Sequence, residues 1–222
     1  MCNKTPSTPA GLDQISYSIE SAAQALGVSA TRTQKLRSLK LLARRSDSGV
    51  AGWDVAYLAS ARQRALPISG PQLVCSMGVE PDTPGRPNML FTRDQNQGYD
   101  ILQVVEDIMW PEGDKESAGL REAFLDGRIG VTGFWRVSED NASSLVNQKG
   151  LILASYTGFI LDGGRVIAEV PELAKRVNET IADASYRGRA FIVAPLQPKD
   201  QDRHLHTYRE PLTGPVVEYL DR

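Results

Sequence analysis

The chain has 222 residues, of which 41% are hydrophobic and 23% are charged, and these values exclude a wholly disordered protein. The formal net charge is −2, but it is unevenly divided. Residues 1–66 hold nine basic and four acidic side chains, whereas residues 67–222 hold 16 basic and 23 acidic ones. This polarity predicts that the first part of the chain binds a polyanion and that the second part has a different role.

Two cysteines, Cys2 and Cys75, provide neither a disulfide framework nor a metal-binding quartet. No apolar run approaches the roughly 18 residues that a membrane span needs, and residues 1–6 lack the apolar core of a signal peptide. We therefore expect a cytoplasmic protein without membrane contact.

In chain order, residues 1–15 are rich in Ser, Thr, Pro and Gly and are predicted to form a flexible leader. A helix is predicted from Ser18, whose hydroxyl can cap it, because apolar residues follow at helical spacing. They are Ile19, Ala22, Ala23 and Leu26. Gly27 can adopt the positive backbone angle of a tight turn, and Ser29 can cap a second helix that runs to about Leu39.

The second helix and the residues just after it carry six basic side chains and no acidic one. They are Arg32, Lys35, Arg37, Lys40, Arg44 and Arg45. Exposed helices normally mix both signs, so this stretch favours contact with DNA over a merely solvated surface. A helix-turn-helix with such a second helix presents a rod of positive charge to the major groove.

The segment 44–52 is rich in Gly and Ser and lies between apolar residues, so a two-stranded wing is predicted there. Trp53 begins a further amphipathic helix, which a Pro- and Gly-containing break at 66–71 ends. Tyr17 and Trp53 are predicted to pack in the core of this small domain rather than to stack on DNA. The first domain accordingly covers residues 16–66.

Several short motifs of this domain match one kind of DNA-binding module. They are Tyr17-Ser-Ile19, Ala22-Ala23, Leu26-Gly-Val-Ser29, Leu41-Leu42 and Trp53-Asp-Val55, with the Gly-containing wing before the last. In these motifs the stretch from Tyr17 to about Ala65 resembles the winged helix-turn-helix domain of the MerR and excisionase-like families. The resemblance implies that the second helix enters the major groove of double-stranded DNA. Many MerR-type proteins have glycine at the position of Lys40 and a long coiled-coil helix after the wing, and this sequence has neither.

The predicted DNA-binding residues lie on the second helix and the wing. They are Ser29, Thr31, Arg32, Thr33, Gln34, Lys35, Arg37, Lys40, Arg44 and Arg45. Three of them, Arg32, Gln34 and Arg37, are predicted to reach base edges, because Arg pairs with guanine and Gln with adenine. The two wing arginines, Arg44 and Arg45, are predicted to clamp phosphates, which adds affinity without sequence information.

Residues 72–222 alternate strand and helix patterns and are predicted to form a mixed α+β domain. Strands are predicted at 73–75, 131–137, 151–159, 190–193 and 216–219, and helices at 99–109, 117–125 and 173–184. The stretch Leu161-Asp-Gly-Gly-Arg165 predicts a hairpin turn between Phe159 and Ile167. Trp135 is predicted to pack in the core.

This second domain carries no motif that names an enzyme. His204 and His206 lie near Asp200, but no third metal ligand follows at a regular spacing, and residues 199–209 are predicted to form a charged surface loop. Neither an activated nucleophile nor a phosphate-binding glycine loop is apparent. We therefore predict no catalytic residue, metal site or cofactor.

Together these features predict a transcriptional regulator that binds double-stranded DNA sequence-specifically as a homodimer. Its second domain is predicted to dimerise it, to bind a partner protein or to sense a small ligand. One alternative is an excisionase-like accessory or architectural factor of recombination, which sharp DNA bending would favour. Another is a defence or modification protein whose second domain carries the activity, which metal-dependent DNA cleavage would favour.

Overall fold

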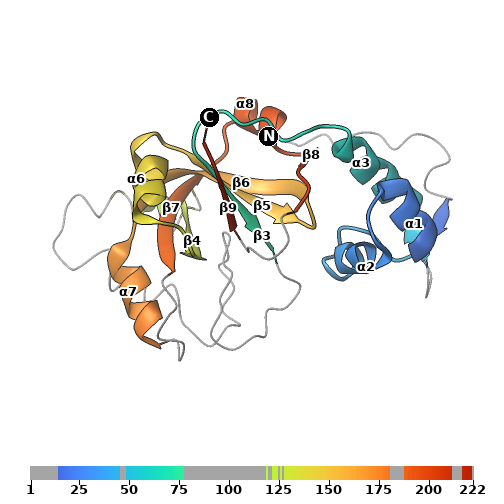
Figure 1. The fold of residues 1–222 in the computed structure, drawn as a ribbon, viewed down its shortest axis with the longest axis horizontal. Helices are drawn as coiled ribbons and strands as arrows, with labels where there is room; N and C mark the ends of the chain where they lie inside the picture. Colours follow the sequence, from blue (N-terminus) through green and yellow to red (C-terminus); the bar gives the residue numbers. More distant parts are fainter. Residues whose placement is uncertain are drawn as a thin grey trace. The chain divides into compact units, whose positions relative to one another are not determined.

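The computed structural model describes residues 15–45, 49–77, 119, 122–124, 126, 128–180, 188–211 and 217–221 (Figure 1). The helix predicted at 99–109 lies outside these residues, as do most of the helix predicted at 117–125 and the end of that at 173–184. The chain forms two compact units. The first unit comprises residues 1–66, 156–159 and 206–211, and the second comprises 67–155, 160–205 and 212–222.

The first unit contains three helices and short strands from both ends of the sequence (Figure 1). Its elements are β1 (Ser16–Ser18), α1 (Ile19–Leu26), α2 (Ala30–Ser38), β2 (Gly49–Ala51), α3 (Gly52–Arg62) and β8 (Thr207–Tyr208). Mixed α and β structure was predicted for the chain, and the structure has it.

The turn between α1 and α2 follows from three residues that the sequence singles out. The Ser18 hydroxyl accepts a hydrogen bond from the Ser21 amide at 3.2 Å and caps α1. Gly27 ends α1 with φ 61°, in the left-handed region that glycine adopts without a side-chain clash. The Ser29 hydroxyl then accepts from the Arg32 amide at 3.2 Å and caps α2. The predicted caps and turn are confirmed.

The segment after α2 folds back on itself and joins β1. Val50 of β2 pairs with Tyr17 of β1 in an antiparallel register, and it also forms a bridge with Arg44. The amide of Ala51 donates to the carbonyl of Ala43 at 2.9 Å, so the two sides of the predicted wing segment are hydrogen-bonded to each other. The strand β1 itself was not predicted.

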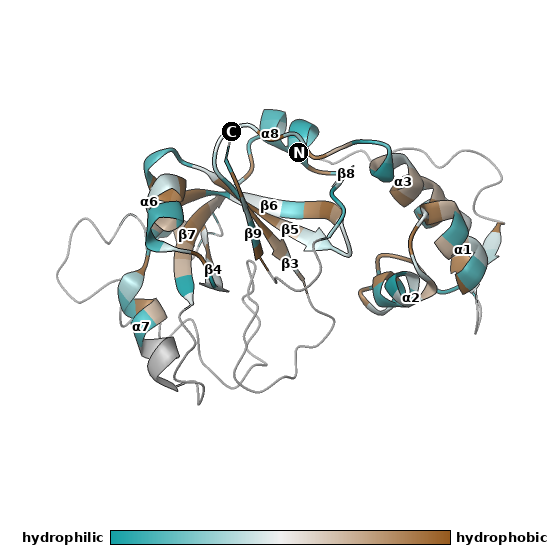
Figure 2. Ribbon diagram, viewed as in Figure 1, coloured by the Kyte–Doolittle hydropathy of each residue, from teal (hydrophilic) through white to brown (hydrophobic). Residues whose placement is uncertain are grey.

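The core of the first unit is built from the apolar faces of its helices. The buried side chains include Ala22, Leu26, Leu36, Leu42, Val50, Val55 and Leu58. Only one apolar residue of α2, Leu36, is among them, and Figure 2 shows α2 mostly hydrophilic while brown segments recur along α3. The helix α2 therefore gives most of its surface to solvent.

The second unit is organised around the strands of a seven-stranded sheet. The elements not yet named are β3 (Gln72–Ser76), β4 (Gly130–Trp135), α6 (Glu139–Asn147), β5 (Leu151–Tyr156), β6 (Phe159–Glu169), α7 (Pro171–Thr180), β7 (Arg189–Pro195), α8 (Pro198–His204) and β9 (Val217–Leu220). The strand order is β4-β7-β6-β5-β3-β9, with β8 pairing with β6 off this path. Strands β3 and β5 are parallel, whereas β9, β7 and β4 join through antiparallel pairs.

The hairpin turn predicted at 161–165 is wrong, because β6 runs through that stretch without interruption. The turn lies earlier, at Thr157 and Gly158, whose φ angles are 56° and 105°. Gly163 fits within the strand because a Cβ there would lie 2.8 Å from the carbonyl oxygen of Ile152. Gly163 thus marks a close approach of neighbouring strands and not a turn.

Two further features of the second half differ from the prediction. The supposed surface loop at 199–209 contains α8 and β8, and the helix α6 was not predicted at all. The hydroxyl of Ser138 accepts from the Asn141 amide at 3.3 Å and caps α6, a signal that the sequence does carry.

The prediction that Trp135 packs in the core is confirmed, since Trp135 is 1% exposed and its indole N–H donates to the Thr132 hydroxyl at 3.0 Å. Among the described residues no helix combines the length and apolarity needed to cross a membrane.

Candidate nucleic-acid interface

The predicted contact residues on α2 divide between the core and the surface. Thr33 is fully buried, and its hydroxyl donates to the Ser29 carbonyl oxygen at 3.1 Å, so its predicted contact with DNA is wrong. Threonine hydroxyls in helices often form such a hydrogen bond to the carbonyl four residues earlier. Ser29, Thr31 and Gln34 are exposed.

The basic residues of this stretch lie at or near the surface. Arg32, Lys35 and Arg37 are half-buried, which is common for long side chains whose stems cover apolar neighbours. Lys40, Arg44 and Arg45 are exposed and lie beyond the end of α2. These six cations are therefore held on one unit of the structure, as the sequence run suggests.

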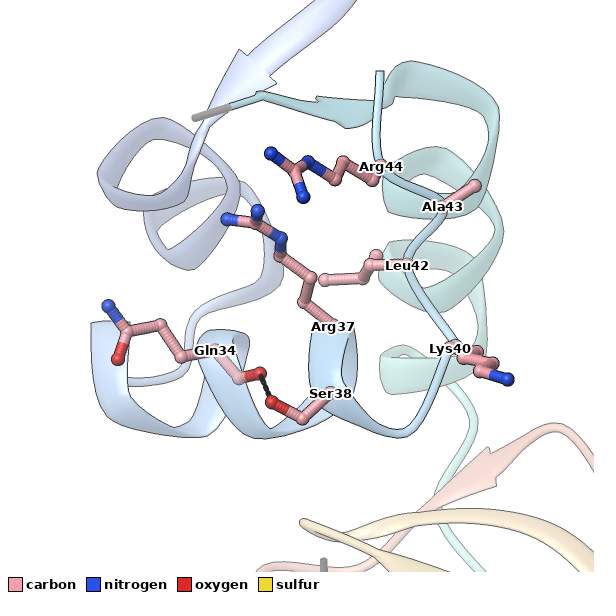
Figure 3. A pocket seen from close by; sticks show the side chains of 7 residues that line it. All are labelled: Gln34, Arg37, Ser38, Lys40, Leu42, Ala43 and Arg44. Atoms are coloured by element: carbon pink, nitrogen blue, oxygen red, sulfur yellow. Dashed lines mark hydrogen bonds between the residues drawn. The ribbon is translucent and has the colours of Figure 1, made fainter. Parts of the chain in front are cut away.

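A groove of about 570 Å³ lies between α2 and the segment that follows it (Figure 3). Its lining residues are Gln34, Arg37, Ser38, Lys40, Leu42, Ala43 and Arg44. Three of these seven are cations and none is acidic. Figure 3 shows Arg37 and Arg44 reaching toward the same side of the groove, from α2 and from the segment after it, whereas Lys40 extends away from them. Such a surface attracts an anionic backbone.

The chain reverses at Lys40, in a conformation that a lysine rarely adopts. Lys40 has φ 59°, and the amide of Leu41 donates to the carbonyl of Leu36 at 3.0 Å, which closes the end of α2. Glycine is the usual residue at such a position. A charged side chain is therefore retained at the rim of the groove at a cost in backbone strain.

A buried carboxylate fixes the start of the segment that carries Arg44. Asp54, in the first turn of α3, is 4% exposed and accepts a hydrogen bond from the Ala43 amide at 2.5 Å. Burial raises the pKa of Asp54, while the hydrogen bond from Ala43 and the positive charge of Arg45 act in the opposite direction. Asp54 thus ties α3 to the predicted wing.

Sequence reasoning did not connect Arg32 with the far end of the chain. The Arg32 Nη1 donates to Oε1 of Glu210 at 2.7 Å, and both residues belong to the first unit. Glu210 also accepts from the Tyr208 hydroxyl at 2.6 Å. The hydrogen bond from Arg32 lowers the pKa of Glu210, with Tyr208 acting in the same direction. A separation of 178 residues leaves no local pattern from which this pair could have been predicted.

The aromatic and histidine predictions had mixed outcomes. Trp53 is 44% exposed, so the prediction that it packs in the core is wrong. The two histidines lie in different units: His204 lies 3.4 Å from the Ser69 hydroxyl, and the His206 Nδ1 contacts the Tyr57 hydroxyl. Burial lowers the pKa of both imidazoles. Within the described ranges no group of three or more metal-ligating side chains is present.

Comparison of the chain with models of known families, with curated proteins and with solved structures finds no match. The chemistry of the site therefore rests on its own residues. A groove lined by cations, beside an exposed polar helix, is suited to bind an extended anion.

Proposed function

We propose that the protein is a sequence-specific, double-stranded-DNA-binding transcriptional regulator. Its first unit acts as a winged helix-turn-helix of the MerR or excisionase-like kind, with α2 as the recognition helix and the segment 44–52 as the wing. The observation that carries this proposal is the run of six cations without an acidic residue from Arg32 to Arg45, half of them around one groove.

The geometry supports a division of labour among these residues. Gln34 and Arg37 lie on α2, where amide and guanidinium groups suit the donor and acceptor patterns of the major groove. Arg44 and Lys40 lie at the groove beyond the helix and suit phosphates. Because two phosphate-binding cations and two base-reading side chains share one groove, a DNA backbone lying along it brings α2 to the bases.

We further propose that the protein acts as a homodimer in the cytoplasm and that its second unit dimerises it or binds a protein or small ligand. Two recognition helices related by a two-fold axis would meet half-sites about one helical turn apart, roughly 34 Å. A palindromic site would follow from that symmetry.

Salt dependence tests the electrostatic part of the proposal. Each phosphate that a cation neutralises releases counterions, so the logarithm of the binding constant should fall with the logarithm of salt by about 0.9 per contact. We expect a slope of about −3 to −5 for the full-length protein, measured by fluorescence anisotropy on duplex DNA. A DNA-binding affinity that does not change with salt concentration would contradict the proposal.

Base selection tests the readout. Arg37→Ala should cost about 1–3 kcal/mol and relax the preference at one base position, whereas Arg44→Ala should weaken all sequences equally and reduce the salt slope by about one. Arg203→Ala, on α8 of the second unit, loses the same charge and should do neither. Selections on randomised duplexes with the three variants decide, and an unchanged base preference for Arg37→Ala would show that α2 grips only the backbone.

A further inference from the structure

We infer that Glu210 is a positioning residue that orients Arg32 for base recognition, so that the segment 206–211 is part of the DNA-reading surface. This inference rests on the proposed DNA-binding function and adds a specificity-determining residue to it. It concerns contacts within the first unit alone.

Arg32 lies close to the start of its helix. The Ser29 cap starts α2 at Ala30, so Arg32 lies in the first turn. The N-terminal residues of a recognition helix are those that contact base edges. The Arg32 side chain is 35% exposed, which leaves part of it accessible to a ligand.

The Arg32 side chain is tied to Glu210 by one charged hydrogen bond. A guanidinium carries five N–H donors in a planar fork, and one of them, on Nη1, is directed to Oε1 of Glu210 at 2.7 Å. Holding one N–H of the group restricts the orientations that the guanidinium can adopt, and a bidentate contact with guanine needs a defined orientation. A free arginine would lose conformational entropy on binding, and an anchored one has already lost much of it.

Glu210 has a further hydrogen-bond partner besides Arg32. Its Oε2 accepts from the Tyr208 hydroxyl at 2.6 Å and lies 3.9 Å from the Arg62 Nη2. The Arg62 guanidinium stacks 4.3 Å from the centroid of the Tyr208 ring, and Phe159 contacts the same ring edge-on at 5.1 Å. Although the Glu210 side chain is 61% exposed, each of its carboxylate oxygens accepts one hydrogen bond, from Arg32 and from Tyr208.

Backbone hydrogen bonds hold the segment that carries Tyr208. Its amide donates to the Arg64 carbonyl at 2.7 Å, and its carbonyl accepts from the Leu66 amide at 3.0 Å. The next amide, of Arg209, donates to the Gly158 carbonyl at 2.9 Å. A Cβ on Gly158 would lie 2.5 Å from the Tyr208 ring, so the turn between β5 and β6 packs closely against the segment 206–211. Glu210 follows directly after this fixed stretch.

The same carboxylate could instead act as a competitor that hides Arg32 from DNA phosphates. The two roles differ in what removal of Glu210 does. Loss of a positioning residue lowers discrimination at one base pair, whereas loss of a competitor raises affinity for every sequence. The anchoring of Glu210 by Tyr208 favours positioning, because a competitor must leave when DNA binds.

The test measures base preference and affinity of the full-length protein on randomised duplexes. We expect Glu210→Ala and Arg32→Ala each to lose about tenfold in discrimination at the same base pair, and the double variant to lose no more than either alone. Tyr208→Phe keeps the ring but removes the hydroxyl that holds Glu210, so it should lose discrimination at that pair to a smaller extent. Glu20→Gln, on the exposed surface of α1, removes one negative charge without touching Arg32 and should leave base preference unchanged.

Three results would overturn the inference. One is a general rise in affinity for Glu210→Ala beyond that of Glu20→Gln, with base preference intact, which would make Glu210 a competitor. Another is an unchanged preference in Arg32→Ala. The third, no binding of duplex DNA by the wild-type protein, would overturn the proposed function as well. Should Glu210→Ala not fold, Glu210→Gln is judged by the same readouts, because its amide oxygen can still accept from Arg32 but its weaker bond should reduce discrimination at the same pair.

Discussion

At the scale of single residues, Lys40 shows a conflict between backbone conformation and charge. Its φ of 59° belongs to the left-handed region, which costs a residue with a Cβ roughly 1–2 kcal/mol. Glycine is the usual residue in this conformation, and here the turn is made with a lysine. Unlike a glycine, the lysine places a positive charge at the groove.

Replacing Lys40 should therefore separate stability from DNA affinity. We expect Lys40→Gly to stabilise the first unit by about 0.5–1 kcal/mol, because relief of the left-handed strain exceeds the greater chain entropy of glycine. The same variant should bind DNA more weakly and show a salt slope shallower by about one. Hydrogen exchange at α1 and α2 and salt titrations of DNA binding measure the two effects.

The second unit offers a matched control for this substitution. Lys149 follows α6 with φ 51°, and the next amide, of Gly150, donates to the Leu145 carbonyl at 2.7 Å, as the amide after Lys40 does to Leu36. Lys149→Gly should gain similar stability without loss of DNA affinity. Equal losses of affinity in both variants would mean that Lys40 acts only through net charge.

Residues that act locally were predicted from the sequence, and those that act across the chain were not. The caps Ser18 and Ser29 and the turn at Gly27 depend on neighbours within four positions, so a local pattern reveals them. Thr33 was misassigned because its helix periodicity alone does not show which face meets the core. Glu210 was missed because its partner is remote in sequence.

At the scale of elements, Asp54 links the helix α3 to the segment that carries the wing arginines. Its carboxylate accepts the Ala43 amide, and the next residue, Arg44, forms a bridge to Val50. The stability of this link depends on a buried acceptor, and losing such a hydrogen bond costs about 0.5–1.5 kcal/mol. The segment that carries Arg44 and Arg45, which we propose bind phosphates, thus depends on one carboxylate outside it.

We expect Asp54→Ala to loosen the 43–51 segment more than the helices. Amides of 43–45 and 49–51 should exchange with solvent at least tenfold faster, and DNA affinity should fall even though no cation is removed. Asp54→Asn keeps an acceptor oxygen and should show a smaller effect on both. Exchange measured by mass spectrometry together with DNA titration checks this, and a loss of affinity without faster exchange would contradict the positioning role.

The strand assignments show which element signals are reliable. Apolar runs marked β3, β5 and β7, because buried strands are continuous in hydrophobicity. The predicted strand 151–159 nevertheless ran on through the turn at Thr157 and Gly158 that separates β5 from β6. The Asp-Gly-Gly stretch in β6 led to the wrong prediction of a hairpin turn. In the sequence alone, a glycine that permits close contact between strands cannot be told from a turn residue.

At the scale of the whole molecule, the first unit is discontinuous in sequence. It combines residues 1–66 with the hairpin tip 156–159 and the segment 206–211. The sequence placed a boundary at the Pro- and Gly-rich break after Leu66 but could not show that later residues return to complete the unit. Composition indicates where a linker lies, but it does not show that residues 156–159 and 206–211 pack with the first unit.

This arrangement leads to a prediction about fragments. A fragment of residues 1–70 lacks Tyr208, which exchanges backbone hydrogen bonds with Arg64 and Leu66 and stacks against Arg62. We expect its helices to exchange amides much faster than in the full chain and its DNA affinity to fall by at least tenfold, because a small unit with an incomplete core is only marginally stable. Residues 71–222 should fold and leave DNA unbound. Tyr208→Ala in the full chain should reproduce part of the fragment's defect, a loss of about 1–3 kcal/mol confined to the first unit. If the 1–70 fragment instead shows the protection and DNA affinity of the intact protein, the segment 206–211 contributes nothing to the unit, and the dependence on Tyr208 is wrong.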